Sequence, residues 1–284
     1  MIGMHIVLPY WQEHRRGLET AAAELGVEAV FTGVSDNNAL RQVEVFNQVL
    51  QANPAGILVS PIDPEAMKGP INEAVARGIP VICFDSDSPD SDRLMYIGTN
   101  NYESGQIAGR LIAESLGGPG DVGILTIPGL YSMDQRQKGF EDYFRDSAPW
   151  IRVAAVGTDD ADPYRAVSVT NQMLEEHPEI RGLFCVNAAG GVGASIALKE
   201  KGMLGDITVV SFDKDAAILD LVEQGDIQAT LVQRTFAMSY YGVKFLYDYN
   251  HRRVGINEES ISSMPVNVDT GVIIVTKENL NQFR

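Results

Sequence analysis

One strand ending is written twice in this chain of 284 residues, at positions 128 apart (207 minus 79). Residues 79–87 read IPVICFDSD, and residues 207–215 read ITVVSFDKD. Both begin with Ile, continue through apolar residues and end in Phe-Asp-x-Asp, as expected where a buried parallel strand gives way to a loop. A second apolar run precedes each copy at similar spacing, GILVS at 56–60 and GLFCV at 182–186. The repetition predicts two similar domains, each with an Asp at the tip of a matching strand.

Strand-like and helix-like patterns alternate along almost the whole chain. This alternation predicts the α/β class, with two similar three-layer αβα domains built on mostly parallel sheets. The expected strands are 5–10, 27–33, 56–60, 79–85, 122–127, 153–156, 182–186, 208–212 and 228–232, with tail segments at 263–268 and 272–276. The expected helices are 13–25 with Gly26 as its stop, one between Asn38 and Asn53, 64–77, 102–116, 133–147, 164–177, 191–201, one after 212, and 236–252.

The chain is strongly acidic, with 22 Lys and Arg against 38 Asp and Glu and a formal net charge of −16. Such a chain repels phosphate backbones, so we expect no nucleic-acid partner. No apolar run reaches the length of a membrane span. The start, MIGMHIVLPYW, enters strand-like sequence without a signal peptide. The expectation is a cytoplasmic protein or one whose export signal is absent from this sequence.

Metal and nucleotide motifs find no support. Cys83 and Cys185 lie inside apolar strand patterns, as small buried side chains do, and no CxxC or Cys/His cluster exists. The acidic run at 85–92 lacks the spacing of a calcium loop and is expected to be a solvated loop. GGVGAS at 190–195 is not GxGxxG, and close helix packing explains its glycines. We therefore expect no metal and no cofactor.

Polar residues follow the expected strands. In open α/β sheets, ligands bind at the carboxyl ends of the strands. Asp85 and Asp213 occupy such ends, and a carboxylate has the lone pairs to accept hydrogen bonds from two neighbouring hydroxyls. The alternative role for each is to cap the following helix.

An ordered series of motifs resembles the type I periplasmic sugar-binding proteins, the ribose- and galactose-binding group, whose fold the effector domains of lactose-repressor-type regulators share. The motifs are PYW (9–11), SPID (60–63), GIPVICFDSD (78–87), IGTNNYESGQIAG (97–109), RQKGF (136–140), EEHPEIRGLFCVNAAGGVGA (175–194), VVSFD (209–213) and ATLVQ (229–233). The resemblance covers nearly the whole chain.

The resemblance implies a discontinuous division of the chain. The first domain would comprise 1–100 plus 235–263, and the second 101–234 plus 264–284. A three-crossing hinge would lie near Asn100-Asn101, Gln233-Arg234 and Met264-Pro265. The ligand cleft would lie between the domains and close on the ligand by hinge bending.

The resemblance also implies which residues bind the ligand. Arg136 would donate to a ring oxygen and an adjacent hydroxyl, and its alternative role is a surface charge. Tyr10 and Trp11 would cover the C–H faces of a sugar ring, and their alternative is ordinary core packing. Asn187 and Gln233 would offer both donors and acceptors. The full expected set is Tyr10, Trp11, Ser60, Asp85, Ser86, Arg136, Asn187, Asp213 and Gln233, with Tyr131 and Tyr164 as weaker aromatic candidates.

Three positions depart from the family pattern. Leu8 stands where an Asn often precedes the Pro of the first loop, Ser86 stands where ribose binders have Arg, and Ser60 replaces a frequent Asn. These changes remove polar contacts on the first domain's side. A pyranose, a deoxysugar or a polyol therefore fits the pattern as well as ribose.

The leading hypothesis is a solute-binding component of a carbohydrate ABC transporter. It would be a monomer that binds a monosaccharide or polyol and delivers it to the permease transmembrane subunits. It would be extracytoplasmic, in the periplasm or as a cell-surface lipoprotein. The alternatives are the effector domain of a lactose-repressor-family regulator without its DNA-binding headpiece, and the sensor domain of a membrane kinase. We do not expect an enzyme. A pair of carboxylates can catalyse glycoside hydrolysis, but Asp85 and Asp213 occupy equivalent places in two related domains, which suits a symmetric grip on a ligand.

Overall fold

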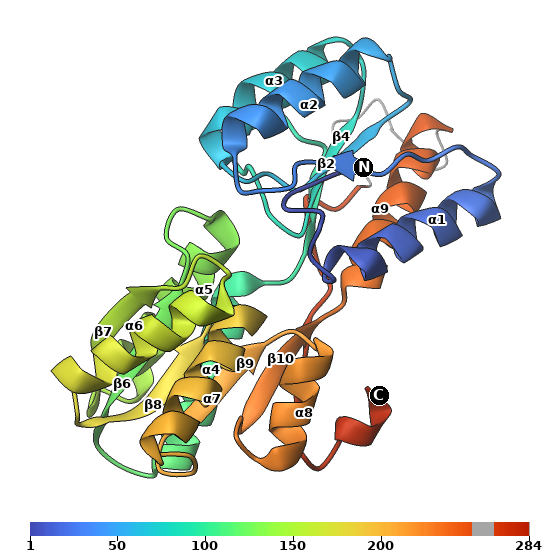
Figure 1. The fold of residues 1–284 in the computed structure, drawn as a ribbon. Helices are drawn as coiled ribbons and strands as arrows, with labels where there is room; N and C mark the ends of the chain where they lie inside the picture. The colour runs from blue at the N-terminus through green and yellow to red at the C-terminus, as the bar shows by residue number, and fades with distance from the viewer. Residues whose placement is uncertain (252–263, 284) are drawn as a thin grey trace. The chain divides into compact units, whose positions relative to one another are not determined.

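The computed structural model describes residues 1–251 and 264–283. The chain forms two compact units, and it passes from one to the other three times. The first unit comprises Met1–Thr99 with Arg234–Gly271, and the second comprises Asn100–Gln233 with Val272–Arg284. Figure 1 shows the first in blue and teal with orange α9, and the second from green through yellow to orange.

The first unit is built on a six-stranded sheet in the order β11-β5-β4-β3-β1-β2, in which all pairs are parallel. Its strands are β1 (Ile2–Gly3), β2 (Thr32–Gly33), β3 (Ile57–Val59), β4 (Val81–Phe84), β5 (Met95–Gly98) and β11 (Asn267–Asp269). Its helices are α1 (Trp11–Leu25), α2 (Ala39–Gln51), α3 (Pro64–Ala76) and α9 (Thr235–Asn250).

Helices cover both faces of this sheet. Side chains of β4 alternate between the faces, so Ile82 and Phe84 pack with α1 and α9, whereas Val81 and Cys83 pack with α2 and α3. In Figure 1 the pairs α1/α9 and α2/α3 lie on opposite sides of the strands. Both faces are apolar, which is why the strands read as continuous hydrophobic runs.

The second unit repeats this plan with the order β12-β10-β9-β8-β6-β7. Only β12 is antiparallel to its neighbour among the strand pairs described. Its strands are β6 (Gly120–Thr126), β7 (Ile151–Thr158), β8 (Ile180–Cys185), β9 (Thr208–Phe212), β10 (Ala229–Gln233) and β12 (Val272–Val275). Its helices are α4 (Asn101–Leu116), α5 (Tyr131–Ser147), α6 (Pro163–Glu176), α7 (Ala188–Lys201), α8 (Ala216–Gln224) and the short η1 (Leu280–Gln282).

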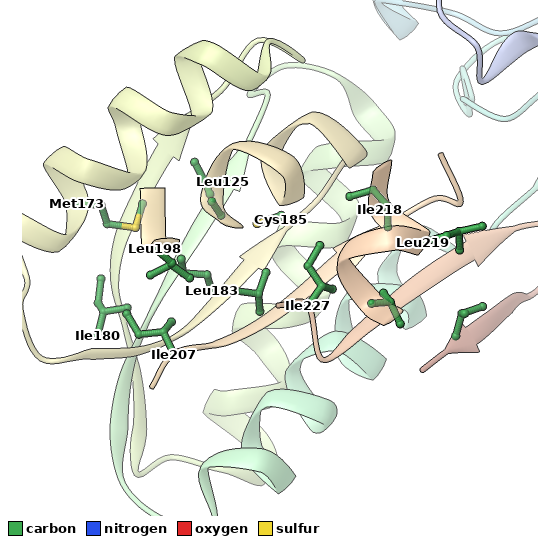
Figure 2. Packing of buried hydrophobic residues seen from close by; sticks show 14 of the residues in the cluster. Leu125, Met173, Ile180, Leu183, Cys185, Leu198, Ile207, Ile218, Leu219 and Ile227 are labelled. Carbon is green, nitrogen blue, oxygen red and sulfur yellow. The ribbon is translucent and has the colours of Figure 1, made fainter. Parts of the chain in front are cut away.

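Two hydrophobic layers again flank the sheet. Phe140 and Phe144 of α5 pack with Phe184 and Phe212 on one face. The other face holds the cluster in Figure 2, where Leu183 and Cys185 of β8 meet side chains of α6, α7 and α8. The prediction of two α/β domains with mostly parallel sheets is confirmed.

Three local predictions are wrong. The first strand is Ile2–Gly3 rather than 5–10, because His5 has a φ of 45° that an extended strand cannot contain. Strand β5 lies in the stretch between 86 and 101 that the sequence left without an element. Strand β11, expected in the second domain within 264–284, pairs with β5 in the first sheet. The stretch 252–263, which includes the end of the expected helix 236–252 and the start of the tail segment 263–268, lies outside the described residues.

The acidic run at 85–92 is not a solvated loop at its start. Asp87 is 5% exposed and pairs with Arg93 at 2.5 Å. The same guanidinium donates to the Val266 carbonyl at 3.3 Å and to Asn267 Oδ1 at 3.2 Å. The run therefore helps to hold the tail strand β11 against the first sheet, a long-range contact that local sequence does not report.

None of the helices in the described ranges is long and apolar enough to cross a membrane. Cys83 and Cys185 are buried free thiols, as their strand patterns predicted.

Candidate functional site

Asp85 stands directly after β4, at the carboxyl end of the first sheet. Its backbone is left-handed, with a φ of 65°. Two hydrogen bonds with residues of β5 hold this conformation. The Asp85 N–H donates to the Ile97 carbonyl at 3.1 Å, and the Tyr96 hydroxyl donates to the Asp85 carbonyl at 3.0 Å. The backbone here is held by hydrogen bonds, so the side chain has a defined direction.

Three of the expected residues meet at the Asp85 carboxylate. The Tyr10 hydroxyl donates to Oδ1 at 2.5 Å, and the Ser60 hydroxyl donates to Oδ2 at 2.9 Å. Ser60 is fully buried and Asp85 is 8% exposed. Each carboxylate oxygen keeps a further lone pair after accepting one bond, so the group can still accept from a ligand.

Trp11 packs in the core of the first unit. The indole is 2% exposed and packs edge-on against Phe84 and beside Phe31 in the core of the first unit. These contacts fit core packing, the alternative role, and the part of Trp11 in ligand binding stays a prediction. Tyr10, its neighbour, hydrogen-bonds to the strand-end carboxylate of Asp85. Ser86 is also buried, at 1% exposure, and its N–H donates to the Phe84 carbonyl.

Asp213 repeats the geometry of Asp85 in the second unit. It follows β9 with a φ of 69°, and its N–H donates to the Leu231 carbonyl of β10 at 2.9 Å. The Thr230 hydroxyl donates to the Asp213 carbonyl at 2.7 Å, as Tyr96 does to Asp85. Gln233 Nε2 donates to Asp213 Oδ1 at 2.9 Å, so these two expected residues are brought together.

Arg136 projects from α5 and is 2% exposed, so it is not a surface charge. Its Nε donates to Asn101 Oδ1 at 2.8 Å and its Nη1 to the Val186 carbonyl at 2.7 Å. The guanidinium lies 3.8 Å from the centre of the ring of Phe212, the residue that precedes Asp213 in the sequence. Within the described ranges no hydrogen bond occupies Nη2, which leaves two donors for a ligand.

Asn187 caps α7, and its side chain is already engaged. Its Oδ1 accepts from the Gly190 N–H at 2.9 Å, and its Nδ2 donates to both carboxylate oxygens of Asp159 at 2.9 and 3.0 Å. Sequence reasoning missed Asp159, although its place directly after β7 is the kind of strand end that identified Asp85. Burial raises the pKa of Asp159 from its usual range to about 6, and the N–H donors of Ala161 and Asn187 oppose this.

The two weaker aromatic candidates are placed differently. Tyr131 is the first residue of α5 and is half-buried, while Tyr164 in the first turn of α6 is 81% exposed. The backbone N–H of Tyr164 donates to Asp162 Oδ1 at 2.8 Å. In the described part of the chain, no group of three His, Cys, Asp or Glu side chains is arranged to hold a metal ion.

Comparison with known proteins agrees with this arrangement. The sequence profile of the periplasmic binding protein domain matches residues 3–251. The chain is 26% identical over 251 residues to the D-allose-binding periplasmic protein of Escherichia coli, an alignment that covers 84% of this chain and 80% of that protein.

Two solved structures are similar over the full length. One is the sugar-binding protein of a sugar ABC transporter from Bacillus halodurans, with 36% identity, a TM-score of 0.92 and coverage of 100% of this chain and 99% of the other. The second is AraP, an arabinose-binding protein from Geobacillus stearothermophilus, with 33% identity, a TM-score of 0.87 and coverage of 100% and 98%. The chain belongs to the periplasmic binding protein family, within its type I sugar-binding group.

Proposed function

We propose that this protein is the solute-binding component of a carbohydrate ABC transporter and that it binds a monosaccharide or polyol. The polar residues at the strand ends of the two units, centred on Asp85 and on Asp213 with Arg136, would grip one ligand together as the units close on it. The relatives support a sugar: one is named for D-allose and another for arabinose.

Arg136 is the observation that carries this proposal. A guanidinium at 2% exposure needs partners that offset its loss of water, and three of its contacts are made by Asn101, Val186 and the Phe212 ring. The remaining Nη2 donors match the paired acceptors of a sugar ring oxygen and its neighbouring hydroxyl. Asp213 follows Phe212 directly and supplies the matching acceptor.

A binding role, not catalysis, suits these groups. Both oxygens of Asp85 accept hydrogen bonds, one from Tyr10 and one from Ser60, so this carboxylate serves as a hydrogen-bond acceptor. The protein would act outside the cytoplasm as a monomer and hand its ligand to the transmembrane subunits of the permease. The periplasmic relatives support this location.

Thermal unfolding against a sugar panel tests the proposal. The panel holds both enantiomers of arabinose, D-allose, D-ribose, D-xylose and myo-inositol. A ligand at a hundredfold its dissociation constant adds about 2.7 kcal/mol of stability, which raises the midpoint clearly.

The variant Arg136→Lys keeps the charge and removes the planar fork, so it should abolish the shift. Arg110→Lys, at an arginine on α4 whose side chain is 44% exposed, is the matched control and should keep it. A full shift in Arg136→Lys, or no response to any sugar, would contradict the proposal.

A further inference from the structure

Asp159 occupies a site built for a carboxylate. Its side chain is fully buried at the end of β7, and its N–H donates to the Thr126 carbonyl of β6 at 3.1 Å. Asp160 and Ala161 follow with φ of 52° and 57°, and this left-handed turn brings the Ala161 N–H to Asp159 Oδ1 at 2.9 Å. Two consecutive non-glycine residues in this region carry a conformational cost, so the turn is held by these bonds.

The opposite wall of this site is Gly190 in the first turn of α7. A Cβ at Gly190 would lie 2.7 Å from Asp159 Oδ2 and 3.2 Å from Cys185 Cβ. Any side chain there would displace the carboxylate. The absence of a side chain at 190 is thus what allows Asp159 to reach Asn187.

The Asp159 carboxylate and the Gly190 N–H both determine how the Asn187 amide is turned. An amide can present either its oxygen or its nitrogen to a neighbour, and only the nitrogen donates to an ionised carboxylate. Because Nδ2 faces both Asp159 oxygens, Oδ1 faces the Gly190 N–H and caps α7. The two N–H bonds of an amide diverge, so one of them points at both oxygens of the Asp159 carboxylate and the other points away from it. This second Nδ2–H and one lone pair of Oδ1 keep a fixed direction in which a ligand can meet them.

We propose that Asp159 is a positioning residue: its ionised carboxylate holds the Asn187 amide in the orientation that binds a sugar hydroxyl, and protonation of that carboxylate releases the amide. The part that concerns the sugar rests on the proposed function. The coupling between Asp159 and Asn187 does not require it.

The charges around Asp159 allow this protonation near neutral pH. The raised pKa of about 6 comes from burial. Asp160 in the same turn raises it further, while Arg165 of α6 lowers it, but Arg165 also forms an ion pair with Asp160. On β8 the neighbouring thiol is Cys185, whose own pKa is raised by burial and by Asp159, so it stays neutral. From α7 the carboxylate meets no charged side chain, only Gly190 and the amide of Asn187 beside it.

Side-chain amide spectroscopy on the ligand-free protein tests the coupling. In 1H–15N spectra the Asn187 NH₂ pair is assigned by its loss in Asn187→Ser and followed from pH 7.5 to 4.5. We expect its shifts to move with a midpoint near pH 6. In Asp159→Asn, which keeps an oxygen acceptor but does not titrate, the movement should vanish. In Asp160→Asn, the neighbouring carboxylate, it should remain.

An Asn187 pair that does not move in the wild-type protein, or that moves equally in Asp159→Asn, overturns the coupling. The wild-type titration decides this even if the variant fails to fold.

Calorimetry with L-arabinose at pH 7.5 and 5.0 tests the consequence. With a pKa near 6, about one tenth of the protein keeps Asp159 ionised at pH 5, so affinity should fall about tenfold, and Asp159→Asn should lose this pH dependence. If the Asn187 amide shifts move with pH but the affinity does not, the positioning role is overturned.

If L-arabinose does not bind, D-allose and D-arabinose replace it. If no sugar binds, the proposed function and the sugar part of this inference fail, and the amide titration still decides the coupling.

Discussion

Asp85 and Asp213 adopt the same left-handed backbone, with φ of 65° and 69°, at the ends of β4 and β9 in two separate sheets. Each donates its N–H to a carbonyl of the next strand, Ile97 for Asp85 and Leu231 for Asp213. Each also accepts at its own carbonyl from a hydroxyl on that strand, Tyr96 or Thr230. The repeated strand ending in the sequence thus corresponds to a repeated backbone device that aims one carboxylate per unit.

Substitution of Asp213 should separate its backbone role from its side-chain role. A φ of 69° costs alanine about 1 kcal/mol and costs glycine little. Asp213→Gly should therefore be more stable than Asp213→Ala by about 1 kcal/mol in urea unfolding. Both variants lack the carboxylate and should lose the sugar-induced rise in the thermal midpoint. Equal stability of the two variants would show that the backbone here carries no strain.

The two hydroxyls on Asp85 should act on stability together. Tyr10→Phe and Ser60→Ala each remove one donor from a carboxylate that is 8% exposed, and each should lower the free energy of unfolding by about 1–2 kcal/mol. Because they share one acceptor, the double variant should deviate from the sum of the single effects. Tyr241→Phe, at a tyrosine that is 51% exposed, is the control and should change stability by less than about 0.5 kcal/mol. Strict additivity would mean that the two bonds are independent.

His14 should make the fold sensitive to acid. Burial lowers the pKa of this fully buried ring from 6.5 to about 4, although the negative charges of Asp85 and Glu13 raise it. Its Nδ1 is hydrogen-bonded to the Ser239 hydroxyl. Between pH 6.5 and 4, His14 is therefore protonated in the unfolded chain but stays neutral in the folded chain. His14 alone should cost up to roughly 3 kcal/mol of stability as the pH falls through this window.

Asp159 acts in the opposite direction over part of the same range. Its pKa is raised from 3.8 to about 6, so the folded chain binds a proton first and gains stability as the pH falls from 6 to 4. Urea unfolding at pH 6.5, 5.5 and 4.5 separates the two groups. Acidification should cost His14→Phe less stability than the wild-type protein, and Asp159→Asn more. If His14→Phe follows the wild-type pH profile, the ring does not control the acid response.

Gly139 should be required for the position of Arg136. A Cβ at Gly139 would lie 1.9 Å from the Tyr102 carbonyl oxygen, and one at Gly105 would lie 2.0 Å from the Arg136 carbonyl oxygen. Helices α4 and α5 thus touch through their backbones at both glycines. Gly139→Ala should lower stability by about 1–3 kcal/mol and weaken sugar binding, because α5 must shift.

Gly69 provides the control for this prediction. It lies inside α3, and apart from its chain neighbours and the nearby helix backbone a Cβ at this position would meet no atom within 4 Å. The gain in helix propensity from Gly69→Ala is opposed by the contact of its Cβ with the ring of Pro70, so stability should change by less than about 1 kcal/mol and sugar binding should stay unchanged. Thermal unfolding with and without the sugar measures both variants. A stable, fully binding Gly139→Ala protein would show that the helices can separate without moving Arg136.

The sequence by itself determined the α/β class of the fold, the presence of two similar domains, and the positions of Asp85 and Asp213 at matching strand ends. Buried parallel strands must be apolar on both faces, and β9 at 208–212 follows from that pattern alone. Helix α1 ends where Gly26 takes a φ of 66°, which is a local backbone property. Such features depend on neighbours in the chain, and a sequence displays its neighbours directly.

Tertiary structure decided which partner each polar or aromatic side chain meets. Trp11 lies in the core because Phe31 and Phe84 come from other strands and turns to enclose it. Asn187 is turned by Asp159, which is 28 residues earlier, and β11 joins the first sheet through contacts that include Arg93, which is 174 residues from Asn267. Burial and pairing at such separations depend on the order of strands in the sheet. Local residue patterns do not encode that order, so the role of Asp159 became visible only in the folded chain.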